Sequence, residues 1–286
     1  MHFLPTFPSI FPTKCLPNFT NKITNKITNK TFFRFFSLKR LLQKSPFWSL
    51  IFWAGVWELI GQMGWMTLLP PLSQIWFAFG EMLEQSAFWD AFAMTARTFT
   101  IGLGLSILVG IPVGILMGLS KRTDKILSIW VNLFLSAPIT AVIPALMPIL
   151  GIGDATVIAT VILFAMWVVI IDTQAGVTHV KDSLVEMGRI FGCSRWKIIF
   201  WIVIPAAMPE IITGIRLAVV RAVKGVIVGQ IVIALIGFGG LFNTYLSYFL
   251  MERFWALIIV VFVMSFTIIG LVELLERRIA FYAKTR

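Results

Sequence analysis

Charged residues are scarce in this chain, since Asp, Glu, Lys and Arg make up only 13% of its 286 residues. Soluble globular domains carry about 25% charged residues, because a solvated surface needs them. Hydrophobic residues reach 58%, and the mean hydropathy is +0.91. The scarcity of charge excludes an ordinary soluble enzyme, and the excess of apolar residues excludes a largely disordered chain. A single membrane domain is the class that fits both numbers.

Cysteine and histidine are nearly absent as well, with two residues of each type. Cys15 and Cys193 cannot form a disulfide framework, and the isolated His2 and His179 lack the spacing of metal ligands. The chain also lacks a phosphate loop, paired catalytic carboxylates and a nucleophile elbow. We therefore expect no catalytic residue, no metal site and no cofactor in this chain, so energy for any work must come from another protein.

Six stretches are apolar enough to be candidate spans, although a bilayer-crossing helix needs about 20 mostly apolar residues and the first is short. They cover about 48–63, 97–119, 127–150, 156–171, 215–236 and 254–275. The third contains Pro138, Pro144 and Pro148, which free backbone carbonyls that neighbouring helices must satisfy, so we expect it inside the bundle. The second has a glycine every four residues from Gly110 to Gly118, where another helix can approach closely. The sequence thus predicts an all-α integral membrane protein, a six-span helical bundle.

Basic residues gather in alternate connecting segments. They occupy the first 47 residues without any acid, follow the second span, recur in 172–210 and end the chain. The segment 64–96 on the opposite side carries three acids and no Lys or Arg. By the positive-inside rule we expect both termini in the cytoplasm. Topology therefore accounts for the net charge of +11, and no nucleic-acid partner is needed.

Residues 1–45 form a basic segment that is rich in Asn, Thr and Phe and contains a short Thr-Asn-Lys-Ile repeat. A repeat this short and polar cannot bury a core, so we expect a disordered cytoplasmic arm before a transmembrane permease domain over 46–286. The absence of acids also fits an organellar transit peptide, and both interpretations stay open here.

The segment 172–210 begins with a predicted short helix. Ser183 and Glu186 have the spacing of a capping box, in which each side chain satisfies the other residue's backbone N–H. Gly192 is placed to end this helix in a left-handed conformation. One face of the helix is apolar and consists of Leu184, Met187, Gly188 and Phe191.

A second short helix is predicted directly after it. Ser194 can cap its first turn, and Pro205 and Pro209 should stop it because proline lacks the N–H group of a helix interior. Its apolar side consists of Trp196, Ile199, Phe200 and Val203.

Glu-Met-Gly at 186–188, Gly192 and Ile-Val-Ile-Pro at 202–205 together resemble the EAA loop of ATP-binding-cassette (ABC) importer permeases. That pattern is Glu-Ala-Ala, three residues, Gly, nine residues, Ile, one residue and Leu-Pro. The acid, the glycine, the first isoleucine and the proline fall at the family's spacing, while Met and Gly replace the alanines and Ile replaces the leucine. The flanking sequence over about 48–280 is similar to the nitrate, sulfonate and taurine type of permease.

The resemblance implies a permease subunit in a bacterial plasma (inner) membrane that moves a small polar or anionic solute inward by alternating access. Its partners would be ATPase subunits that bind ATP and Mg, an extracytoplasmic substrate-binding protein, a second copy or a homologous permease, and membrane lipid. The loop would be the coupling helix on the ATPase. The residues implied in coupling are Ser183, Glu186, Gly188, Gly192, Cys193, Ser194, Arg195 and Pro205.

Arg221 and Lys224 lie near the cytoplasmic start of the fifth span and share a helix face, since they are three residues apart. They could form a positive wall of the substrate path, or they could reach the interface and pair with nearby acids such as Asp172. Gln230, the third candidate path residue, stands where the subgroup often has glutamate, so this chain departs from the subgroup pattern by having no acid at this position. An ion-coupled secondary transporter or channel is the alternative function, although we find no inverted repeat in the sequence.

Overall fold

The structure is a computed structural model that describes residues 45–64, 68–233 and 235–284. All regular secondary structure in these residues is helical. The chain divides into two compact units, one up to Trp65 and one from Met66 onward. The first contains the described helix α2, Ser45–Gln62. The predicted arm over 1–45 lies outside the described residues except for Ser45, which begins α2.

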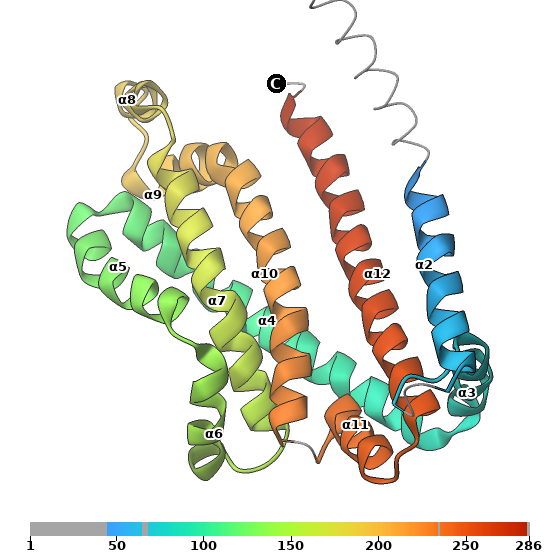
Figure 1. Cartoon of the computed structure of the whole chain (residues 1–286). Helices are drawn as coiled ribbons and strands as arrows, with labels where there is room; N and C mark the ends of the chain where they lie inside the picture. The colour runs from blue at the N-terminus through green and yellow to red at the C-terminus, as the bar shows by residue number, and fades with distance from the viewer. Residues whose placement is uncertain (1–44, 65–67, 234, 285–286) are drawn as a thin grey trace, which may run out of the picture. The chain divides into compact units, whose positions relative to one another are not determined.

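The second unit contains the remaining helices (Figure 1). In chain order these are α3 (Leu72–Glu84), α4 (Ser86–Leu119), α5 (Lys121–Ser136), α6 (Ile139–Leu150), α7 (Asp154–Thr178), α8 (Asp182–Ile190), α9 (Arg195–Ile198), the π-helical turn η1 (Ile199–Val203), α10 (Ile204–Ile233), α11 (Gly237–Ser247) and α12 (Met251–Lys284). Within this unit α8 and the C-terminal end of α12 lie on one side, and α6 and α11 lie on the opposite side (Figure 1).

Among the residues that the structure describes, four helices are long and apolar enough to cross a membrane: α4, α7, the continuous run Arg195–Ile233 and the part of α12 up to Leu274. The bent pair α5 and α6 is a fifth candidate. The helix α2, which corresponds to the predicted first span, is not among the candidates. Its 18 residues include three tryptophans and Glu58, which lower its hydropathy. Six spans are therefore not confirmed.

The predicted third span is a sharply bent helix pair instead of a straight helix. The axes of α5 and α6 differ by 101°, and the break falls at Ala137 and Pro138. Proline pushes the preceding residue out of the α-helical region, and Ala137 has the extended values φ −69° and ψ 141°. Val131 and Ile143 are the buried residues described in this pair. Much of this segment is therefore exposed in the single chain, and its place inside the bundle stays a prediction.

The core of the unit is the contact between α4 and α7, which run parallel. A Cβ atom added at Gly102 would lie 2.6 Å from the Cβ of Val161 on α7. The corresponding distance is 2.8 Å from Gly110 to Val169 and 2.6 Å from Gly118 to Val177. At Gly114 the added atom would lie 2.6 Å from the Cβ of Thr173. The glycines thus let the two backbones approach, which confirms the close helix contact predicted from their four-residue spacing.

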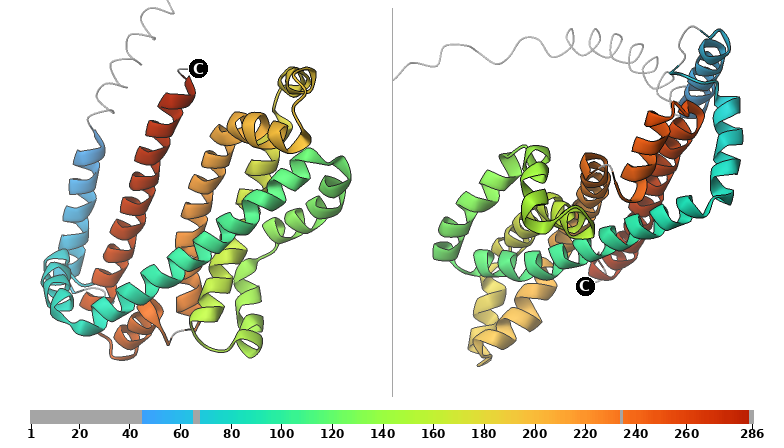
Figure 2. Two further views of the ribbon diagram at one scale, coloured as in Figure 1. Left: turned by 180° about the vertical axis from the view of Figure 1, so that it is seen from behind. Right: turned by 90° about the horizontal axis from the view of Figure 1, so that it is seen from below.

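The helix α10 runs antiparallel to α7 and covers another side of it. Gly176 faces Glu210, Gly214 faces Asp172, and Gly225 faces Phe164. The central buried cluster lies between these helices and consists of Val157, Val161, Ala165, Val169, Ala218, Ala222, Val226 and Ile233. Figure 2 shows α4 crossing this helix pair obliquely.

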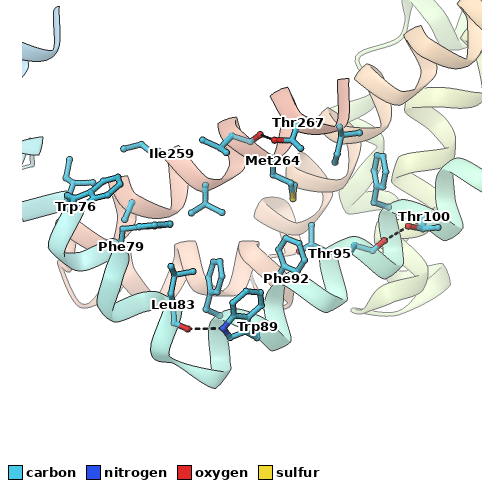
Figure 3. A pocket seen from close by; sticks show the side chains of 18 of the residues that line it. Trp76, Phe79, Leu83, Trp89, Phe92, Thr95, Thr100, Ile259, Met264 and Thr267 are labelled. Carbon is cyan, nitrogen blue, oxygen red and sulfur yellow. Dashed lines mark hydrogen bonds between the residues drawn. The ribbon is translucent and has the colours of Figure 1, made fainter. Parts of the chain in front are cut away.

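The helices α3, α4 and α12 line a partly open cavity of about 860 Å³ whose lining is almost entirely apolar. Trp76 and Phe79 from α3 lie on one side of it, and Ile259 and Met264 from α12 lie on another (Figure 3). The helix α12 therefore packs much less tightly against its neighbours than α7 does.

Candidate functional site: the loop between α7 and α10

The helix α8 is a short helix that ends in a Schellman motif. Gly192 adopts φ +72°, the Gly192 N–H donates to the carbonyl of Arg189 at 2.9 Å, and the Cys193 N–H donates to the carbonyl of Gly188 at 3.0 Å. These are the two hydrogen bonds that define the motif, and they satisfy carbonyls left over at the helix end. The predicted left-handed helix end at Gly192 is confirmed.

The start of α8 differs from the prediction. Its N-cap residue is Lys181, and no side chain caps the helix, so Ser183 lies inside the first turn and forms no capping box with Glu186. Asp182 precedes Ser183 and provides a negative charge in the first turn, where the helix dipole favours it. Ser194 does hold the N-cap position of α9, as predicted, but its side chain makes no capping hydrogen bond.

One side of α8 is anchored to the rest of the unit. Gly188 is buried, and a Cβ atom there would lie 2.6 Å from Cδ1 of Ile202 and 3.2 Å from Cγ1 of Ile198. Val185 and Cys193 pack against the cluster under the loop, which includes Val177, Ile198, Val203, Ala207 and Ile211. The loop therefore rests on the ends of α7 and α10 and cannot move independently of them without breaking this cluster.

The opposite side of α8 is apolar and exposed. The exposed fractions are 46% for Met187, 84% for Ile190 and 78% for Phe191. The sequence interpretation missed Ile190, although its spacing of three from Met187 could have placed both on one helix face. Exposed apolar side chains that lie together mark an interaction surface. This exposed face, Met187, Ile190 and Phe191, is called the α8 face below.

The two prolines after the loop do not stop a helix. The run Arg195–Ile233 is continuous over 39 residues and passes through Pro205 and Pro209. The π-helical turn Ile199–Val203 ends two residues before Pro205. A π turn relocates the carbonyl that a proline cannot bond, so the helix continues. The prediction of a second short helix that ends at these prolines is wrong, and the loop instead connects directly to a membrane-crossing helix.

The three candidate path residues lie in two different environments on α10. Arg221 and Lys224 are both exposed on one face of the helix, so the structure brings these two together. Gln230 is 0% exposed, and its Oε1 lies 3.0 Å from Oγ1 of Thr95 on α4 and 3.2 Å from the backbone N of Phe238 on α11. The structure therefore separates Gln230 from the two basic residues.

The fold and the loop define the class: a helical membrane protein in which a short external helix sits on the ends of the spanning helices. Residues 110–281, more than half of the chain, match the family described as binding-protein-dependent transport system inner membrane component. The chain belongs to this family.

The similar proteins include named transport permeases. The chain is 29% identical over 208 residues to the bicarbonate transport system permease protein CmpB of Synechocystis sp., covering 68% of this chain and 73% of that protein. It is 27% identical over 227 residues to the putative aliphatic sulfonates transport permease protein SsuC of Bacillus subtilis, covering 79% and 82%.

The fold is also similar to a solved structure. It matches a chain of the MetNI methionine ABC transporter in inward-facing conformations with a TM-score of 0.56 and 18% identity, covering 67% of this chain and 94% of that one. Together with the family match, these similarities make the chain a multi-pass permease subunit of an ABC importer, and they do not favour the ion-coupled transporter or channel.

Proposed function

We propose that α8 is the coupling helix that docks into a groove of a separate ATPase subunit. The exposed apolar α8 face carries this proposal, because a short helix with one anchored side and one free apolar side suits a helix-in-groove contact. The ATPase, and not this chain, would hold ATP and Mg. Closure of the ATPases would then move the loop together with α7 and α10.

The loop residues have separate roles in this proposal. Gly188 and Cys193 fix α8 to the cluster under the loop, and Gly192 sets the direction in which the chain leaves the helix. Glu186 and Arg195 are exposed and would pair with charges at the edge of the ATPase groove. Pro205, with the π turn before it, joins the loop to α10. Ser183 and Ser194 make no capping hydrogen bond, so we assign them to contact with the partner.

The test is a pull-down of the tagged permease in mild detergent with identification of the proteins that come with it. We expect a stoichiometric ATPase, which Ile190→Asp and Gly192→Asp should reduce at least tenfold. Gly151→Asp is the matched control, because Gly151 also has a positive φ and open space around it but lies between α6 and α7. Undiminished ATPase binding by Ile190→Asp would contradict the proposed docking surface.

The orientation proposed for the chain places α8 and both termini in the cytoplasm, with α2 as a further span and six spans in total. The distribution of basic residues supports it, because the segments 64–96, 151–153 and 237–253 together contain a single basic residue, Arg253, whereas 172–210 contains Lys181, Arg189, Arg195 and Lys197. The positive-inside rule counts Lys and Arg in the connecting segments, so the side that carries α8 should be the cytoplasmic one. Reporter fusions at each terminus should be active only as cytoplasmic reporters.

We further propose that the solute is a small anion, and that it passes a face of α10 that carries Arg221 and Lys224. Both side chains are exposed in the single chain, and they would line a cavity completed by a second permease subunit. The names of the relatives, bicarbonate and aliphatic sulfonates, agree with an anionic solute. Transport would follow alternating access, a two-state equilibrium biased by nucleotide and by a substrate-binding protein on the outer side.

The solute proposal is tested by transport into proteoliposomes with bicarbonate, taurine and an alkanesulfonate as probes. Lys224→Gln should raise the KM for the transported anion, whereas Lys125→Gln, which removes an exposed charge from the first turns of α5, should not. An unchanged KM in the double variant Arg221→Gln/Lys224→Gln would exclude these residues from the path.

A further inference from the structure

Gln230 is a buried polar residue where three helices meet, and coupling through α8 leaves it unexplained. It lies one turn before the end of α10 and is 0% exposed. Its Oε1 contacts Thr95 of α4 at 3.0 Å and the backbone N of Phe238 in α11 at 3.2 Å. Its Nε2 is buried without a hydrogen-bond partner among the described residues. Burying an amide N–H without a partner costs folding free energy, so this residue calls for a structural or functional explanation.

The first turn of α11 indicates what Gln230 does. Ile236 is the N-cap residue of α11 and provides no side-chain cap, so the first N–H groups of this helix lack partners within it. A backbone N–H can only donate a hydrogen bond, so the side-chain atom that faces the Phe238 N–H must be an acceptor. The side-chain amide of Gln230 is therefore oriented with Oε1, and not Nε2, toward α11. Gln230 therefore caps α11 from a neighbouring helix, in the place that a Ser or Asp side chain takes in an ordinary N-cap.

The first turn of α11 is shaped to fit this cap. A Cβ atom at Gly237 would lie 2.4 Å from Nε2 of Gln230, and one at Gly239 would overlap the carbonyl group of Gln230. Phe238 is 0% exposed and packs on Phe88 and Phe92 of α4, with ring centroids 6.0 and 6.3 Å apart. The start of α11 is thus held against α10 by the cap and against α4 by aromatic packing.

The same helix that carries Gln230 begins at the coupling loop. The run Arg195–Ile233 is continuous over 39 residues, although its first part lies across the direction of the rest (Figure 1). Its first residues lie beside α8, and Gln230 lies at its far end against α11. One continuous helix therefore connects the proposed ATPase contact to the helix on the opposite side of the unit.

We infer that Gln230 is a positioning residue that ties α11 to α10, so that movement of the coupling loop is passed through α10 to α11. The inference rests on the proposed function for the identity of the moving partner. The cap itself rests on the contacts of Gln230 alone, so the two parts can fail separately.

The cap is tested by amide hydrogen exchange of the purified full chain, with two variants that differ in chemistry and not in size. Gln230→Glu keeps an acceptor facing a helix N-terminus, where negative charge is favoured. Gln230→Met keeps the length of the side chain and removes the acceptor. We expect exchange in the peptide around Phe238 to be about tenfold faster in Gln230→Met, the loss of one hydrogen bond, and near wild type in Gln230→Glu.

A side chain that only fills space predicts the opposite order, because methionine packs well in an apolar site and a buried carboxylate does not. Faster exchange in Gln230→Glu than in Gln230→Met would therefore overturn the cap. Equal exchange in all three proteins would overturn it as well.

The transmission is tested with a labelling site on α11. Asn243 is exposed, so Asn243→Cys provides a thiol whose maleimide labelling is counted above that of the parent protein. In the complex with its ATPase, ATP with vanadate should change the labelling rate at least threefold. That change should persist with Gln230→Glu and disappear with Gln230→Met.

The outcomes separate the two proposals. A nucleotide effect that survives in Gln230→Met shows that α11 moves without the cap and overturns the transmission. No ATPase in the complex would remove the nucleotide effect from every variant and contradict the proposed function, while the hydrogen-exchange order would still decide whether Gln230 caps α11.

Discussion

The helices α7 and α12 are both long and apolar enough to cross a membrane, yet they are packed very differently. In the most apolar window of α7, 44% of the residues are buried, against 11% in α12. Glycines of α4 and α10 meet α7 along its whole length. The side of α12 that faces α3 and α4 borders the cavity of about 860 Å³.

Polar contacts near the first turn of α12 add to the burial of Met251, Ala256 and Leu257 in the same part of the helix. Arg253 pairs with Glu81 of α3 at 3.0 Å, and the indole Nε1 of Trp255 donates to the carbonyl of Leu68 at 2.9 Å. The comparison shows that hydropathy identifies a span but not its place in the bundle. That place depends on where small residues recur on the facing helices.

The largest effect should come from the contact between α4 and α7. Gly114→Ala places a Cβ atom 2.7 Å from the carbonyl oxygen of Ile170, which is backbone and cannot move aside. We expect a loss of about 1–3 kcal/mol of stability from overpacking, measured as a lower midpoint of thermal unfolding in detergent.

The matched control for this variant lies on the same helix. Gly104 has nothing within 4 Å of its added Cβ, so Gly104→Ala should stabilise α4 by up to about 1 kcal/mol through helix propensity. The same sign of change in both variants would show that the glycines act through flexibility and not through close packing.

A smaller effect should distinguish the two helices directly. Val169 of α7 is 0% exposed, so Val169→Ala should cost about 2 kcal/mol for two lost methyl groups and the cavity left behind. Val260 of α12 borders the existing cavity, so Val260→Ala should cost less than about 1 kcal/mol. Equal shifts of the unfolding midpoint would mean that the cavity beside α12 is filled when the protein is folded.

The ion pair between Arg253 and Glu81 near the first turn of α12 should contribute less to stability than the buried valine. Glu81→Gln removes the charge partner of Arg253, whose pair is partly exposed, so the loss should be about 1 kcal/mol or less and should shrink at high salt. A loss that does not depend on salt would indicate a structural hydrogen bond and not an ion pair.

The smallest effect is expected at the first turn of α7. Arg97 lies 4.0 Å from Asp154 with a largely exposed side chain, so Arg97→Gln should leave the unfolding midpoint unchanged within error. A measurable shift here would contradict the conclusion that interior packing, and not surface charge, holds α7 in place.

Local rules predicted the features that depend on neighbours in the chain. The contact through Gly110, Gly114 and Gly118 follows from helical periodicity, and the turn at Gly192 follows from the missing Cβ atom of glycine. Both are confirmed by contacts and dihedral angles of those residues.

The errors arose where tertiary structure changed a local preference. A π turn carries the helix past Pro205, and Lys181 replaces Ser183 at the start of α8. The bend at Pro138 follows from a local preference, the effect of proline on the residue before it, but its angle of 101° could not be predicted from the sequence. The cap of Gln230 on α11 joins residues of three helices, and no spacing in the sequence indicates it.

The four-residue glycine period also restricts how α4 and α7 can slide along each other. Between neighbouring glycines the α4 surface carries side chains, so a shift by one or two residues would press them onto the valines of α7. A slide by four residues, about 6 Å at 1.5 Å per residue, again places glycines of the run 110–118 opposite β-branched residues of α7. The packing therefore disfavours any slide of this pair shorter than about 6 Å, so we expect smaller rearrangements during transport to take place at other helix contacts.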